Sequence, residues 1–261
     1  MSLESLCNEL LLYVFEFLDD VHLLHAFYGL NYRFNALLFV CNRRCHFDFR
    51  STYKRDFQTI CEKYVPSIVD RITSICFSDS QDTPLQIIHY LDNSMPLRLF
   101  SNLRSLSLCH IHSYKTLENI SKVWHLFPHL TQLCFIDCHM EPPNHVDRPS
   151  YDRCQSLVDR IWCLTKLTRC HFGISFGNTL FQIPTVTSMS LKRLSMEHFR
   201  LNFSQLTELI ERTSYIQYLC ISISLRSVDI ALSLIIPTIT SLILYVRDAP
   251  HCFQETFKMY A

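Results

Sequence analysis

A six-residue pattern of apolar side chains, apolar-x-x-apolar-x-apolar, recurs along most of the chain and restricts its fold more than any other feature. The seven copies are Ile72/Ile75/Phe77, Leu103/Leu106/Leu108, Leu130/Leu133/Phe135, Leu167/Cys170/Phe172, Leu191/Leu194/Met196, Ile216/Leu219/Ile221 and Ile239/Leu242/Leu244. Their first positions lie 23 to 37 residues apart. Alternate residues of a strand point to opposite faces, so the second and third apolar positions predict one buried side of a short strand. Each copy therefore predicts one strand of a repeating unit.

Apolar residues at helical spacing lie between several of these copies. They are Leu117/Ile120/Val123/Trp124/Phe127, Leu157/Ile161/Leu164 and Leu206/Leu209/Ile210, the last with Ser204 as its expected start. A strand followed by a helix, repeated at this period, resembles the leucine-rich repeat family over about residues 69–246. The resemblance implies a solenoid arc with parallel strands and helices. The longest step contains the Pro-rich stretch 141–149, which we interpret as a loop insertion.

The first 38 residues carry a second constraint, an apolar run that covers most of a helix circumference. The run contains Leu10, Leu11, Leu12, Tyr13, Val14, Phe15, Phe17 and Leu18, and only Glu9 and Glu16 interrupt it. A helix that is apolar nearly all round must be covered on more than one side. So short a segment does not supply that cover itself, and we expect a partner surface. The later apolar clusters predict two further short helices before residue 40.

This segment resembles an F-box. The matching positions are Leu6, Cys7, Glu9, Leu10, Leu11, Val14, Phe15, Leu18, Leu23, Leu24, Arg33 and Phe34. Cys7 stands where the family has Pro, and Phe34 where it has Trp. Proline normally pre-sets the first helical turn, so the change at Cys7 is expected to affect the tightness of docking rather than the fold. The resemblance implies that Leu6, Cys7, Glu9, Leu10, Leu11, Phe15, Leu18, Leu23, Leu24 and Phe34 form the adaptor-binding segment, with contact and core residues not yet separated.

These patterns predict an α/β (α+β) chain with four parts. They are a three-helix F-box at 1–40, a linking helix and N-terminal cap of the solenoid at 41–68, about seven irregular leucine-rich repeats at 69–246, and a C-terminal tail at 247–261. Phe47 to Val65 is the stretch expected to form the linking helix. The tail contains no clear closing cap, which such arrays need, so a truncated and a divergent chain are both open.

Composition excludes several function classes. The 24 basic and 24 acidic residues balance, and no long basic run is present, which argues against a nucleic-acid partner. Only Gly29, Gly173 and Gly177 are available, so no Gly-rich phosphate loop exists and no cofactor is expected. The N-terminus lacks the basic region of a secretory signal. Ile230 to Val246 is uncharged and at the lower edge of a spanning length, but Pro237 and the repeat pattern favour a buried helix-turn-strand over a membrane segment.

Cysteine and histidine are abundant, with 13 of each, but no Cys-x-x-Cys pair occurs. The spacing closest to a zinc half-site is Cys41-x-x-x-Cys45-His46. Most of the cysteines fall at repeat positions, where a small apolar side chain fits the core, so we expect no metal. Asp19-Asp20 is interpreted as a solvated turn between helices. A thiol hydrolase remains an alternative, although no local signature of one is visible. Free thiols favour a reducing compartment, cytoplasmic and/or nuclear.

The residues between the buried positions of each strand predict the inner face of the arc. Those chosen as the tentative substrate-binding residues are Gln132, Arg169, His171, Arg193, Ser195, Tyr218 and Tyr245. This face is small, nearly neutral and slightly basic around Arg169 and Arg193. It is better suited to a peptide or protein than to a polyanion.

Together the two resemblances imply a non-catalytic substrate-recognition subunit of a Skp–cullin–F-box ubiquitin ligase. Its expected partners are the Skp adaptor, through it a cullin and RING protein, and an unidentified target protein. Three alternatives stay open: a repeat scaffold not attached to a ligase, a thiol hydrolase and a membrane-associated chain.

Overall fold

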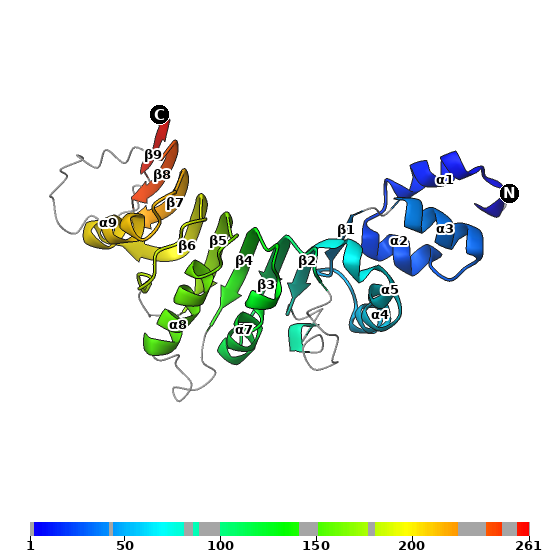
Figure 1. Ribbon diagram of the computed structural model, residues 1–261, viewed down its shortest axis with the longest axis horizontal. Coiled ribbons are helices and arrows are strands. Elements are labelled where there is room, and N and C mark those ends of the chain that lie inside the picture. The colour runs from blue at the N-terminus through cyan, green and yellow to red at the C-terminus, as the bar shows by residue number, and fades with distance from the viewer. Residues whose placement is uncertain are drawn as a thin grey trace. The chain divides into compact units, whose positions relative to one another are not determined.

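The computed structural model describes residues 3–41, 44–80, 86–88, 100–140, 151–176, 181–223, 239–246 and 255–260, and these form a mixed α/β chain (Figure 1). The chain divides into two compact units. Unit 1 comprises Met1–Cys109 with Leu126–His129, and unit 2 comprises His110–His125 with Leu130–Ala261.

Unit 1 begins with a 3-10 turn, η1 (Leu3–Ser5), and three short helices, α1 (Asn8–Phe15), α2 (Asp20–Phe27) and α3 (Tyr32–Cys41). The three helices pack around a small apolar core that contains Leu11, Phe15, Val21, Leu23, Leu24, Phe27, Phe34, Leu37 and Leu38. The ring of Phe27 lies 4.7 Å from that of Phe15 and 5.4 Å from that of Phe34, measured between centroids. One aromatic side chain from each helix therefore meets at the centre of this segment.

Arg33 fastens the N-terminal turn to α3. Its guanidinium donates to the Asn8 side chain (2.8 Å), to the carbonyl of Glu4 (2.7 Å) and to the carbonyl of Leu6. The Asn31 side chain donates to the Glu4 carboxylate at 3.0 Å. Because Arg33 carries several donors in a fixed planar fork, one side chain fixes three points of the preceding segment.

The acidic pair at the start of α2 has two structural roles. Asp19 caps the helix by accepting from the backbone N–H of His22 at 2.9 Å. Asp20 accepts from the backbone N–H of His46, a residue of the first strand, β1 (Cys45–Asp48). Burial raises the pKa of Asp20 against the opposing effect of that hydrogen bond. Asp20 is thus more than the solvated turn residue that the sequence indicated, since it ties α2 to the strand.

The remainder of unit 1 contains three strands and a run of short helical segments. Its elements are β1 (Cys45–Asp48), α4 (Lys54–Thr59), the π-helical η2 (Ile60–Tyr64), α5 (Val65–Ile68), η3 (Val69–Arg71), β2 (Ile72–Ser78) and β3 (Ser105–Cys109). Strand β2 pairs with β1 and with β3, both in parallel. The expected linking helix therefore begins seven residues later than Phe47. Cys45, Phe47 and Phe49 are buried on alternate positions, which is a strand pattern.

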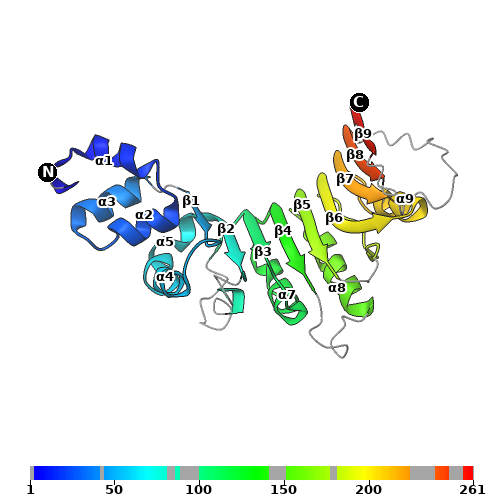
Figure 2. The ribbon, with the colours of Figure 1, turned by 180° about the vertical axis from the view of Figure 1, so that it is seen from behind.

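The described residues of unit 2 form a series of strands with helices between some of them. Its elements are α7 (Tyr114–Ser121), η5 (Trp124–Leu126), β4 (Gln132–His139), α8 (Tyr151–Trp162), β5 (Arg169–Ser175), β6 (Arg193–Leu201), α9 (Phe203–Glu211), β7 (Tyr218–Ile223), β8 (Ser241–Val246) and β9 (Glu255–Tyr260). Strands β4 to β8 are parallel neighbours in chain order, and β9 runs antiparallel to β8. Figures 1 and 2 show α7, α8 and α9 on one face of these strands.

The apolar pattern sets the register of the strands in unit 2. Its second position is aligned across five parallel strands, at Leu133, Cys170, Leu194, Leu219 and Leu242. The first four of these side chains are buried. The prediction of parallel strands at these copies is therefore confirmed, and successive strands of unit 2 follow one another in a solenoid-like arrangement. Strand β9 lies in the segment that was predicted as a tail. Most of the uncharged stretch 230–246 lies outside the described residues, although its last six residues form β8.

Helix α9 begins at a capping box that the sequence pattern misplaced. Asn202 accepts from the backbone N–H of Gln205 at 2.8 Å, and the Gln205 side chain accepts from the backbone N–H of Asn202 at 3.0 Å. The two residues have the three-residue spacing of such a box, whereas Ser204 and Glu208 do not. The helix therefore starts at Phe203, with Ser204 already inside its first turn.

Gly173 lies where two strands of unit 2 approach closely, and we predict that Gly173→Ala destabilises the protein. An added Cβ would lie 2.4 Å from the carbonyl oxygen of Phe135, a backbone atom. Overpacking of this kind costs about 1–3 kcal/mol or more. Urea denaturation measures the loss, with Ser175→Ala as the control on the same strand. Equal unfolding midpoints for Gly173→Ala and the unsubstituted protein would contradict the close approach.

Candidate interaction surfaces

Ten of the fourteen large apolar side chains that the described residues expose lie within residues 3–40, and these ten are here called the N-terminal surface. It consists of Leu3, Leu10, Tyr13, Val14, Phe17, Leu18, Leu30, Tyr32, Phe39 and Val40. The other large apolar side chains that the described residues expose are Tyr53, Met189, Phe203 and Tyr215. Single exposed apolar residues are normal, so the part of this set that matters is the part in which exposed apolar residues lie side by side.

Helix α1 has two apolar sides, and only one of them is used within the chain. Leu11 and Phe15, one turn apart, are 0% and 1% exposed and point into the three-helix core. Leu10, Val14 and Phe17 follow one another at spacings of four and three residues and are 51%, 38% and 73% exposed. These spacings place the second set along one stripe of the helix and the turn that follows it. This stripe has no cover among the described residues.

The structure separates the residues predicted to bind an adaptor into two groups. Leu11, Phe15, Leu23, Leu24 and Phe34 are buried, and Cys7, Glu9, Leu10 and Leu18 are exposed, with Leu6 between them. The first group can act on a partner only by holding the helices together. The prediction also omitted exposed residues of the N-terminal surface, among them Tyr13 and Phe17, whose rings contact edge to face at 5.1 Å. Their spacing from Leu10 was the signal that could have found them.

The face of unit 2 opposite its helices, here called the open face, carries all the tentative substrate-binding residues. In register across four parallel strands lie Gln132, Arg169, Arg193 and Tyr218. A second row contains His171 beside Ser195, and Tyr245 lies on β8. These side chains are exposed or half-buried, and for all of them except Tyr245 the next residue along the strand is buried, as alternation requires. The strand register thus brings together the residues that the repeat pattern selected.

Charge is unevenly distributed over the open face. Arg169 and Arg193 are exposed neighbours on β5 and β6, and neither guanidinium makes a hydrogen bond or ion pair within the described residues. Glu197, four residues further along β6 than Arg193, lies 3.6 Å from His171 in a carboxylate–imidazole contact. The start of these strands is therefore cationic, and the acidic group lies toward their other end.

A hollow of about 320 Å³ opens on the same face. It is lined by Ser195, Met196, Glu197, His198, Cys220, Ser222 and Tyr245. His198 adopts a left-handed backbone conformation with φ of 64°, at a point where the pairing of β6 with β7 shifts register. The hollow is at the small end of the range for ligand pockets, which suits one or two side chains rather than a large cofactor.

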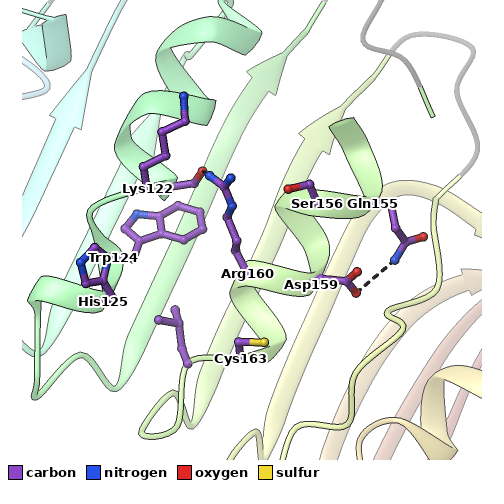
Figure 3. A pocket seen from close by; sticks show the side chains of 10 residues that line it. Lys122, Trp124, His125, Gln155, Ser156, Asp159, Arg160 and Cys163 are labelled. Atoms are coloured by element: carbon purple, nitrogen blue, oxygen red, sulfur yellow. Dashed lines mark hydrogen bonds between the residues drawn. The ribbon is translucent and has the colours of Figure 1, made fainter. Parts of the chain in front are cut away.

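A second cavity, of about 690 Å³, lies on the helix side of unit 2 between η5 and α8 (Figure 3). Its polar groups are mostly occupied within the chain. Arg160 donates to the Ser121 hydroxyl at 2.9 Å, and Lys122 lies 3.3 Å from a Glu118 carboxylate oxygen. The Asp159 carboxylate accepts from the backbone and hydroxyl of Thr185 at 2.7 and 2.8 Å. We interpret these groups as supports that hold neighbouring repeats together.

Several of the described thiols have the properties of core residues, whereas Cys7 and Cys163 are exposed. Burial raises the pKa of Cys154 to about 11 and that of Cys61 to about 12, and it also raises the pKa of Cys170. A nucleophilic cysteine needs the opposite shift, because the thiolate is the reactive form. Among the described residues, no group of three or more His, Cys, Asp or Glu side chains could hold a metal ion.

The comparisons with known proteins identify no relative, because neither a family model nor a curated protein matches this chain. In the parts of the chain that the structure describes, no helix is both long enough and apolar enough to cross a membrane.

Proposed function

We propose that this chain is a non-catalytic substrate receptor of a Skp–cullin–F-box ubiquitin ligase. The N-terminal surface would bind the Skp adaptor, and through it the cullin and RING protein. The open face of unit 2 would hold a target protein. Free thiols at several buried positions are compatible with a reducing compartment, the cytoplasm or the nucleus.

The observation that carries this proposal is the second apolar stripe of α1. Leu10, Val14 and Phe17 remain exposed although the same helix already buries Leu11 and Phe15. Fully burying one Leu or Phe side chain contributes about 1.5–3 kcal/mol, so a partner that covers this stripe gains a substantial free energy. The resemblance of residues 6–34 to the F-box pattern supports the Skp adaptor as that partner.

The proposed mechanism is proximity rather than chemistry on this chain. A target held on the open face is kept at a high effective concentration near the ubiquitin-conjugating enzyme that the cullin carries. The reactive thioester and its lysine acceptor lie on other proteins. The receptor therefore needs only two binding surfaces, each held in place by the packing of its own unit.

Co-expression of the full chain with a Skp adaptor tests the proposal. We expect the two proteins to elute together at equal stoichiometry in size-exclusion chromatography. Separate elution of two folded proteins would leave a repeat scaffold that uses its N-terminal helices for another partner. Deleting residues 1–40 is a poor variant for this purpose, because these residues contact the rest of unit 1. The ring of Tyr28, the residue after α2, lies 4.5 Å from the ring of Tyr64, measured between centroids.

A further inference from the structure

The two arginines of the open face form an unusual pair. Arg169 and Arg193 occupy directly paired positions on parallel strands, which lie about 4.8 Å apart. Like charges at directly paired positions destabilise a sheet. Neither side chain finds a carboxylate within the described residues, and the nearest row positions hold the uncharged Gln132 and Tyr218. Repulsion between the two guanidinium groups therefore destabilises the isolated chain, and a bound anion would remove this repulsion.

The distance from this pair to the hollow matches the geometry of an extended peptide. Ser195 lines the hollow and lies two residues after Arg193 on the same side of β6. Two residues of a strand span about 6.6 Å, and the side chains at positions i and i+2 of an extended peptide are separated by the same distance. Consider an extended peptide that runs along β6 with an anionic side chain at the two arginines. Its side chain two positions further along then lies at the hollow.

The size and charge of the face exclude larger anionic partners. A nucleic acid would need a continuous basic stripe, and this chain has equal numbers of basic and acidic residues. Further along β6 than Arg193, the acidic Glu197 lines the hollow. A single carboxylate accepts bidentate hydrogen bonds from arginine and can be shared by two guanidiniums.

We propose that the open face of unit 2 binds an extended protein segment in which an Asp or Glu carboxylate is shared by Arg169 and Arg193. The side chain two positions from that carboxylate occupies the hollow beside Ser195, Cys220 and Tyr245. This inference rests on the proposed function and names the class of target: an acidic, extended segment rather than a folded basic surface.

Selection from a displayed library of random 12-residue peptides tests this inference on the full chain. We expect the selected peptides to be enriched in Asp or Glu, with a restricted residue two positions away. One selected peptide, synthesised with a fluorescent label, is then measured by anisotropy. Arg169→Gln with Arg193→Gln should weaken its binding at least about tenfold, because charge-assisted hydrogen bonds are lost. Arg169→Lys with Arg193→Lys should retain part of it.

The matched control removes two positive charges from the helix side of unit 2. Lys115→Gln with Arg153→Gln changes exposed residues on α7 and α8 and should leave peptide binding unchanged. A selection without acidic enrichment, or equal losses in both double variants, would overturn the proposal. The selection contains no adaptor, so its outcome does not depend on whether the N-terminal surface binds one. The Arg169→Gln/Arg193→Gln chain should still bind the Skp adaptor, so the two questions have separate readouts.

Discussion

Replacing Leu10 and Phe17 with Asp in the full chain is expected to abolish binding to a Skp adaptor while the protein stays folded. Both side chains are largely exposed, at 51% and 73%, so the free chain loses no core contact. In a complex each substitution removes about 1.5–3 kcal/mol of apolar burial and places a carboxylate in the interface. Since 1.4 kcal/mol corresponds to a factor of ten, affinity should fall by more than about a hundredfold.

Two controls make this result specific to the N-terminal surface. Met189→Asp with Tyr215→Asp introduces the same charges at exposed apolar positions of unit 2 and should leave adaptor binding unchanged. Leu11→Asp is unsuitable, because Leu11 is fully buried and the variant should lose the three-helix core instead. Pull-down with a tagged adaptor and circular dichroism separate the two kinds of loss. Undiminished binding by the Leu10/Phe17 variant would show that the exposed stripe is not the docking site.

Phe172→Ala is expected to lower the free energy of unfolding by about 3–5 kcal/mol, more than the truncation of an exposed side chain would. Phe172 is fully buried, and its ring lies 5.5 Å from Phe135, 5.8 Å from Phe181 and 5.6 Å from Phe199, measured between centroids. Its removal leaves a cavity among aromatic side chains that come from two strands, β4 and β6, and from a connecting segment. Packed interiors relax only partly around such a cavity.

Phe203→Ala provides the matched control, since the same side chain is 42% exposed at the start of α9. It should change the unfolding free energy by less than about 1 kcal/mol. Thermal or urea unfolding of both variants measures the difference. Similar midpoints would contradict the placement of Phe172 at the centre of unit 2.

The sequence predicted the structure best in the strands, where buried and exposed positions alternate. The six-residue pattern predicted strands β2 to β8, because a period of two fixes which side chains are buried and leaves one register for the pairing. That register also placed Arg169 beside Arg193. The hollow next to them was not predictable, since its shape depends on a shift in pairing near His198 and on Tyr245 from a strand about 50 residues further along the chain.

The N-terminal helices show why the same reasoning fails at a nearly all-apolar segment. Without a polar side, the spacing of α1 does not reveal whether Leu10 or Leu11 faces the core, and the structure assigns the core to Leu11. The prediction for the stretch after residue 41 was wrong for a different reason. Cys45, Phe47 and Phe49 alternate over too few positions to outweigh the helical residues that follow, so the expected linking helix wrongly included the last two residues of β1.

Isothermal titration of the full chain with a purified Skp adaptor, at several temperatures, tests the central claim most directly. The account predicts a one-to-one complex with a negative heat-capacity change, because apolar surface is buried on binding. It also predicts that the Leu10→Asp/Phe17→Asp chain gives no binding heat at any of these temperatures. No binding by the unsubstituted chain, or a complex that the double substitution leaves intact, would contradict it.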